Sequence, residues 1–133
     1  ETLWWRRTSY NPSYGYALDA AFSPDGRVLA LGRLRYPEPG TLALWDLLGM
    51  VQRELGEGYA YRPAFSPDGS LLLVGSATPA GSLIQLYETQ DWQVLWSARS
   101  RAHHAPLVAF APDGKSFATA LGDGTVMVWK LED

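Results

Sequence analysis

A five-residue motif that recurs three times constrains the fold of this chain more than any other feature of its sequence. The copies occupy residues 22–26, 65–69 and 110–114 and have the sequences FSPDG, FSPDG and FAPDG. Successive copies begin 43 and 45 positions apart. Repeats of this length each form one supersecondary unit, and neighbouring units bury a shared core. The sequence therefore predicts three similar structural units.

Each motif is a turn signal, and apolar runs follow it at similar distances in every repeat. Proline presets φ, aspartate tolerates the second central position and glycine accepts a positive φ, so Pro-Asp-Gly closes a tight hairpin. The apolar runs cover residues 27–32, 70–75 and 115–120, then 41–45, 83–87 and 125–129, then 51–55 and 94–98. Short runs rich in Val, Leu and aromatic residues predict β-strands. Four strands in each repeat of this length predict one antiparallel blade of a β-propeller.

The chain resembles the WD-repeat β-propeller family, with three degenerate repeats. One Trp-Asp pair and two degenerate versions of it stand at the same place in the repeat: Trp45-Asp46, Tyr87-Glu88 and Trp129-Lys130. Residues 122–129 resemble the loop that leads into that strand in the family. The resemblance implies an all-β propeller fold and a scaffold that binds proteins without catalysing a reaction.

The chain departs from the family at a Gly-His pair, which opens a blade of the family before its first strand. His103 and His104 are the nearest match, and they lie too close to Phe110 for the usual spacing. In the family this histidine joins an Asp, a Ser or Thr and the Trp in a hydrogen-bond network. The resemblance therefore does not carry the whole network over to any repeat, and Asp123 and Trp129 can keep part of it in the third.

We name the strands of a blade a to d, from the central axis outward. The repeat then predicts a d strand at residues 3–8, blades over about 16–56 and 59–99, and a third blade over about 105–131. The third blade needs a d strand from another chain or blade, which is the velcro closure that the resemblance implies. Propellers contain about 4–8 blades, so three cannot close a ring alone. We expect a homodimer that forms a six-bladed ring, and half of a longer single-chain propeller is the alternative.

The d–a and b–c loops are expected to share one face of the ring, and they are rich in Tyr and Arg. These residue types are enriched at binding hot spots, so this face is predicted to bind a protein partner. The candidate partner-binding residues are Tyr10, Tyr14, Tyr16, Arg33, Arg35, Tyr36, Tyr59, Tyr61, Arg62, Arg99, Arg101, His103 and His104. The opposite face, with the a–b turns and the c–d loops, is predicted to be acidic.

Composition and motifs argue against catalysis, cofactors and several classes of partner. The net charge of −3 gives no reason to expect nucleic acid or a membrane, and the absence of cysteine removes thiolate metal sites. No common catalytic motif occurs, and Asp19 is the only carboxylate in the expected a strands. His103 and His104 are expected to be loop residues, because neighbours in an extended chain point to opposite sides and no further ligand is spaced for a metal. We expect no catalytic residue, no cofactor and no metal site.

The leading interpretation is a non-catalytic protein–protein interaction scaffold. Three alternatives stay open: a sensor that binds a small ligand or an anion at the axial mouth, a propeller hydrolase, and a designed or excised fragment with only a structural role. Without cysteines the redox compartment cannot be deduced. The working expectation is a soluble protein, with a lean to the cytoplasm.

Overall fold

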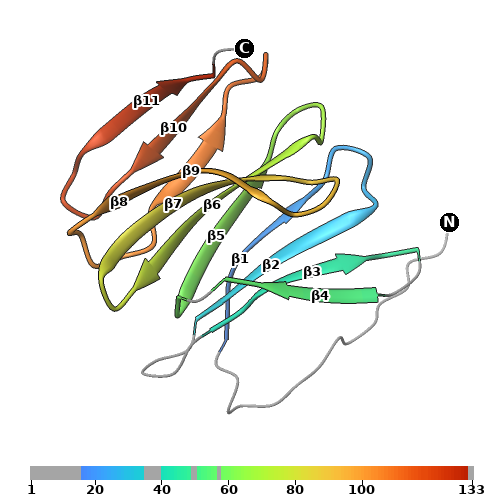
Figure 1. Cartoon of the computed structure of the whole chain (residues 1–133), viewed down its shortest axis with the longest axis horizontal. Helices are drawn as coiled ribbons and strands as arrows, with labels where there is room; N and C mark the ends of the chain where they lie inside the picture. The colour runs from blue at the N-terminus through green and yellow to red at the C-terminus, as the bar shows by residue number, and fades with distance from the viewer. Residues whose placement is uncertain (1–15, 35–39, 49–50, 57, 132–133) are drawn as a thin grey trace, which may run out of the picture.

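The computed structural model describes residues 16–34, 40–48, 51–56 and 58–131, and all regular structure in this part of the chain is β-strand (Figure 1). The strands are β1 (Tyr16–Phe22), β2 (Val28–Leu34), β3 (Leu42–Asp46), β4 (Val51–Leu55), β5 (Ala60–Phe65), β6 (Leu71–Thr78), β7 (Gly81–Glu88), β8 (Val94–Ser100), β9 (Leu107–Phe110), β10 (Ser116–Ala120) and β11 (Val126–Lys130). The described part contains no helix long and apolar enough to cross a membrane.

The strands form three sheets in chain order, and all neighbouring strands are antiparallel. The orders are β1-β2-β3-β4, β5-β6-β7-β8 and β9-β10-β11. Successive connections of such a meander alternate between the two ends of the sheet. We call the end with the β1–β2, β5–β6, β9–β10, β3–β4 and β7–β8 connections the turn face. The end with the β2–β3, β4–β5, β6–β7, β8–β9 and β10–β11 connections is the loop face.

The recurring motif forms the β1–β2, β5–β6 and β9–β10 turns, as its residue types predict. Gly26, Gly69 and Gly114 have φ of 72°, 78° and 71°. Residues with a side chain rarely adopt this backbone conformation. In the first turn the Asp25 carboxylate accepts hydrogen bonds from the Ser23 hydroxyl at 2.7 Å and from the Arg27 amide at 3.0 Å. These bonds give partners to donors that would otherwise bond to water. The motif therefore stabilises its turn with its own residues.

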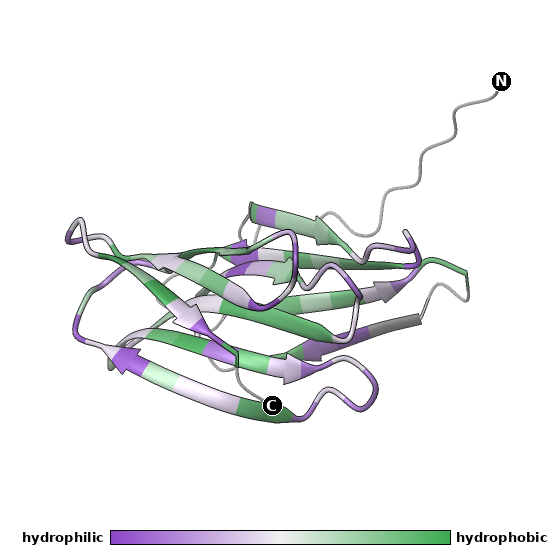
Figure 2. Ribbon diagram, turned by 90° about the horizontal axis from the view of Figure 1, so that it is seen from above, coloured by the Kyte–Doolittle hydropathy of each residue, from purple (hydrophilic) through white to green (hydrophobic). Residues whose placement is uncertain are grey.

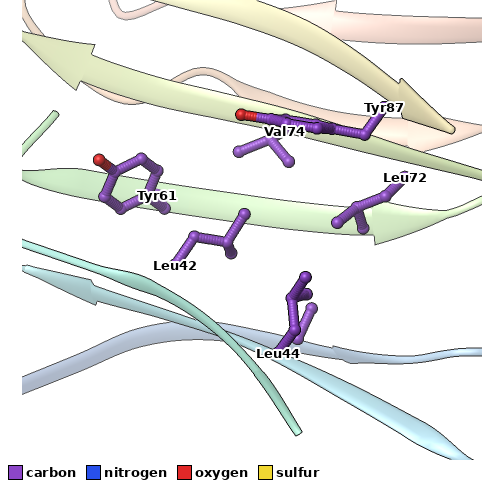
Figure 3. Packing of buried hydrophobic residues seen from close by; sticks show 7 residues of the cluster. Leu42, Leu44, Tyr61, Leu72, Val74 and Tyr87 are labelled. Atoms are coloured by element: carbon purple, nitrogen blue, oxygen red, sulfur yellow. The ribbon is translucent and has the colours of Figure 1, made fainter. Parts of the chain in front are cut away.

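The first and second sheets share an apolar core that lies between them. Leu42 and Leu44 of β3 meet Tyr61 of β5 and Leu72 and Val74 of β6 (Figure 3). All five side chains are buried. Burial of each large apolar side chain stabilises the fold by roughly 1.5–3 kcal/mol, so this core holds the two sheets together.

The second and third sheets share a second core of aliphatic and aromatic residues. Ile84 and Leu86 of β7 belong to the same cluster as Phe117 of β10. Trp96 of β8 reaches across and packs edge-to-face on Trp129 of β11, with ring centroids 4.9 Å apart, and on Phe117 at 5.9 Å. Trp96 and Trp129 therefore pack between the second and third sheets. Seen from above, apolar stretches follow the strands and polar residues gather at the connections (Figure 2).

The inner strands bring the three sheets together in series. β5 lies against β1 and β2, and β9 lies against β5 and β6 (Figure 1). Gly32 of β2 lies so close to the Tyr61 carbonyl oxygen that a Cβ would collide with it, and Gly75 of β6 is placed in the same way against the Pro106 carbonyl. Glycine is therefore required at both sheet junctions.

The predicted fold class is confirmed as an all-β chain of antiparallel sheets with three to four described strands each. The predicted strand at residues 3–8 lies outside the described residues, as do residues 132 and 133. Blade boundaries, the number of blades in the ring and its closure stay predictions.

Candidate interaction surface

The structure describes the side chains of eight of the thirteen candidate partner-binding residues. Tyr10, Tyr14, Arg35 and Tyr36 lie outside the described residues, and Tyr16 begins β1 but its side chain is not described. The remaining candidates lie in loop-face connections or in the strands beside them, so they are on or near the loop face.

Tyr61 was predicted to bind a partner at the surface, but it lies in the core. Its ring packs between the first and second sheets, and its hydroxyl donates a hydrogen bond to the Gly58 carbonyl at 2.9 Å. With the side chain buried and its polar atom paired, Tyr61 closes the end of the core. Tyr59 is only half-buried, and its amide donates to the Ala77 carbonyl at 2.9 Å.

Two arginines lie on inner strands of neighbouring sheets. Arg33 of β2 is half-buried, and its amide donates to the Thr41 carbonyl at 3.0 Å, which ties β2 to the segment before β3. Arg62 of β5 is also half-buried, and its Nε atom is fully covered without a hydrogen-bond partner among the described residues. A covered guanidinium N–H without an acceptor is unusual, because burial removes the water that would otherwise accept its hydrogen bond.

The last four candidates form one exposed basic segment. Arg99 lies at the loop-face end of β8, and Arg101, His103 and His104 follow in the connection to β9. All four are exposed. Of the predicted set, these are the residues that the structure brings together at the surface.

The basic segment is held at both sides by neighbouring turns. The Ser82 hydroxyl of β7 donates to the His104 carbonyl at 2.5 Å. Gly81 lies directly against the Ser100 carbonyl, and a Cβ at Gly122 would stand 2.8 Å from the His104 ring. The segment therefore connects the β6–β7 and β10–β11 turns along the loop face. Among the described residues, no group of three or more His, Asp or Glu side chains gathers as a metal site would require.

A groove begins at the loop face and runs along β7. Its volume is about 480 Å³, and its lining includes Gly58, Pro79, Leu83, Tyr87 and Arg99. The Tyr87 hydroxyl donates to the Gln85 side-chain oxygen at 3.1 Å within this lining. Sequence reasoning included Arg99 and missed the rest, because the groove depends on how the β4–β5 connection lies against the second sheet.

The third sheet keeps part of the hydrogen-bond network of a Trp-containing repeat. Trp129 Nε1 donates to the Thr119 hydroxyl at 3.0 Å, and Thr119 is buried. Asp123 accepts from the Thr125 amide at 2.9 Å, and the hydrogen bonds from the Thr125 backbone and side chain lower its pKa below 3.8. The Asp123 carboxylate therefore closes the β10–β11 turn.

Comparison with known proteins agrees with this architecture. Residues 100–130 match the family model described as WD domain, G-beta repeat. The chain is similar to WD-repeat β-propellers. The β-propeller domain of Cps50 (Swd1) from Myceliophteria thermophila aligns with it at a TM-score of 0.70 and 26% sequence identity. The alignment covers 90% of this chain and 36% of that domain, so the chain spans about a third of the matched structure.

The comparisons confirm the resemblance to WD repeats that the recurring motif predicts. WD-repeat propellers generally serve as scaffolds for protein interactions. This likeness indicates a general class of function and does not identify a partner. No curated protein sequence matches the chain. Because the WD-repeat match begins at residue 100, the first two sheets are assigned to the fold by their structure.

Proposed function

We propose that this chain is a non-catalytic scaffold that binds an acidic segment of a protein partner at its loop face. The observation that carries the proposal is the exposed basic segment from Arg99 to His104 beside the groove along β7. Arginine can bind a carboxylate through two parallel hydrogen bonds, and Arg99 lines the groove together with apolar residues such as Leu83 and Val94. An extended peptide with acidic and apolar residues matches this combination.

Site-specific photo-crosslinking tests where partners bind. A photoreactive phenylalanine analogue replaces Arg101 on the loop face in one variant and Lys115 on the turn face in another; both side chains are exposed. The proposal predicts crosslinks to a partner from position 101, and loss of those crosslinks when Arg99→Ala is added. Crosslinks to the same partner from position 115 alone would contradict the assignment of the face.

A small anion at Arg62 is the second candidate function. Its support is the covered Nε atom, which has no acceptor among the described residues. A bound carboxylate or phosphate would supply one. Calorimetric titration of the chain with inorganic phosphate should give saturable binding that Arg62→Gln abolishes. If the wild-type chain shows no saturable binding, Arg62 does not hold a small anion.

The scaffold is completed by a second copy of the chain, and the exposed face of the third sheet supports this. Val128 of β11 is 71% exposed, whereas Leu44 and Leu86 at the same register position of β3 and β7 are 3% and 5% exposed. Val126 is 67% exposed, although its counterparts in β3 and β7 are buried. In the first and second sheets, this face is covered by the sheet that follows. No further sheet follows the third one in the described chain.

The first sheet offers a matching face at the other end of the stack. Phe22 is 62% exposed, whereas its counterparts Phe65 and Phe110 pack into the two cores. A contact between the third sheet of one copy and the first sheet of another would join apolar surfaces like those already joined inside the chain. Large exposed apolar surfaces favour association.

The junction between copies differs at one residue from the junctions inside the chain. Gly32 and Gly75 permit the close approach of the next inner strand, and Ala120 stands at the equivalent position of β10. The Ala120 methyl group keeps the partner further away. The strand that would approach it, β1, has an irregular register between Ala17 and Asp19. The ring is therefore expected to hold less tightly between copies than within one.

A further inference from the structure

A second hollow lies at the turn face, on the side of the molecule opposite the proposed partner site. Its volume is about 260 Å³, and its lining includes Pro24 and Asp25 of the first turn, Phe65 and Asp68 of the second, and Trp92 of the β7–β8 connection. We call it the turn cleft. The two turns are in contact here, because a Cβ at Gly69 would meet Pro24 Cδ at 3.4 Å.

The cleft presents two carboxylates, and a nearby positive charge, that of Arg27, acts on Asp25. Asp25 is bonded by Ser23 and the Arg27 amide, and Asp68 by the hydroxyls of Ser66 and Ser70 and by the Ser70 amide. Neither carboxylate forms an ion pair with a described residue. A carboxylate has about four acceptor sites, so each can accept further hydrogen bonds from a ligand.

Both carboxylates stay charged at neutral pH. The Ser23 hydroxyl and the Arg27 amide lower the pKa of Asp25 below 3.8, and the Ser70 amide and hydroxyl lower the pKa of Asp68 below the same value. Both groups are exposed, so their charge is available to a ligand that enters from solvent.

An aromatic ring lies beside these charges. Trp92 packs against the first core and has a φ of 59°, which few non-glycine residues adopt. The connection is held by hydrogen bonds of 2.8 Å from the Trp92 amide to the Glu88 carbonyl and from the Glu88 amide to the Gln93 carbonyl. A fixed indole ring attracts cations to its face, and arginine stacks on it better than lysine does.

The charge of the surrounding surface favours the same class of ligand. Acidic residues outnumber basic ones among the described residues of the turn face: Asp25, Asp46, Asp68, Glu88, Asp91 and Asp113 against Arg27, Lys115 and Lys130. A negative surface attracts positively charged segments and fixes their orientation.

We propose that the turn cleft binds an arginine side chain from a basic segment of a protein partner, with the guanidinium between Asp25, Asp68 and the Trp92 ring. This inference is independent of the proposed function, since it uses the opposite face and ligands of opposite charge. Asp113 stands at the same place in the third turn and is not among the residues that line the turn cleft.

The test is a titration of the full chain with the peptide acetyl-Gly-Arg-Gly-amide, followed by NMR. The readout is the indole N–H signal of Trp92, which is assigned by its loss in Trp92→Phe. A second peptide replaces arginine with citrulline, which keeps the shape of the side chain and removes its charge. The variants are Asp68→Asn, and Asp113→Asn as a control with the same change in net charge; asparagine keeps the side-chain oxygen that closes each turn.

The proposal predicts saturable shifts of the Trp92 signal with the arginine peptide and none with the citrulline peptide. Asp68→Asn should weaken binding about tenfold, because a charge-assisted hydrogen bond is replaced by a neutral one, and Asp113→Asn should leave it unchanged. Equal losses in the two variants would mean attraction by net charge alone and would overturn the site. Equal binding of the citrulline peptide, or shifts that spare Trp92, would also overturn it. The comparison of the two peptides needs no variant, so it stands even if Asp68→Asn disturbs the turn.

Discussion

Single hydrogen bonds distinguish the three repeats from one another, and the tryptophans of β3 and β11 give the clearest case. Trp129 Nε1 has its acceptor in Thr119, whereas Trp45 Nε1 is buried without a partner among the described residues. Leu31 occupies in β2 the register position that Thr119 occupies in β10. Both stand nine positions after the Phe of their motif, so the sequence alone could have located the missing acceptor.

Leu31→Thr should be more stable than Leu31→Val, because its hydroxyl can accept the Trp45 hydrogen bond. A buried donor that gains a partner contributes about 1 kcal/mol to the free energy of unfolding. Leu31→Val is the matched control, since it has nearly the same shape as threonine and no hydroxyl. Urea unfolding followed by circular dichroism should place the threonine variant above the valine variant. Equal stabilities of the two would show that Trp45 gains nothing from an acceptor there.

The turn carboxylates make stability depend on pH. The folded chain lowers the pKa values of Asp25, Asp68 and Asp123 below the ordinary value of 3.8, so the unfolded chain binds more protons near that pH. Their contribution is fully present above the unfolded pKa and is lost as the pH falls through the folded values. The free energy of unfolding should therefore rise between about pH 2 and pH 5. Replacing all three with asparagine should flatten this rise, and an unchanged slope would contradict the assignment.

Individual strands were well predicted where the motif fixes their start and their faces. The apolar run 51–55 coincides with β4, and the run 41–45 differs from β3 by one residue at each end. The error at Tyr61 came from treating it as a loop residue. Tyr61 lies four positions before Phe65, and even spacing in a strand places both on the face that packs against the first sheet. The groove and the turn cleft could not be predicted, because they depend on the spacing between sheets.

The third turn lacks one component that the other two contain. Ser23 and Ser66 each donate to the turn carboxylate and accept from the first residue of the next strand, while Ala111 can do neither. Ala111→Ser should restore both bonds to Asp113 and Ser116, and add roughly 0.5–1.5 kcal/mol to stability. In an Asp113→Asn background the gain should shrink. Thermal unfolding of the four variants measures the coupling, and a gain of the same size in both backgrounds would argue against the shared bond.

At the scale of the whole molecule, the chain is a stack of three sheets with exposed apolar surfaces at both ends. The sequence predicted the repeat, and the contrast between Val128 and its buried counterparts shows that this face of the third sheet is exposed. Val128→Asp should prevent association of two copies, because a charge would be buried without a partner. Leu48→Asp is the control, since Leu48 is 75% exposed and lies in the β3–β4 connection on the turn face. Ala120→Gly should strengthen association by removing the extra methyl group from the junction.

The solution mass of the isolated chain tests the central claim most directly. Sedimentation equilibrium over a range of concentrations should reveal a folded species of twice the 14.7 kDa of one chain, and Val128→Asp should reduce it to one chain while Leu48→Asp leaves it unchanged. A well-folded species of 14.7 kDa at every concentration, with Val126 and Val128 open to solvent, would contradict completion of the propeller by a second copy.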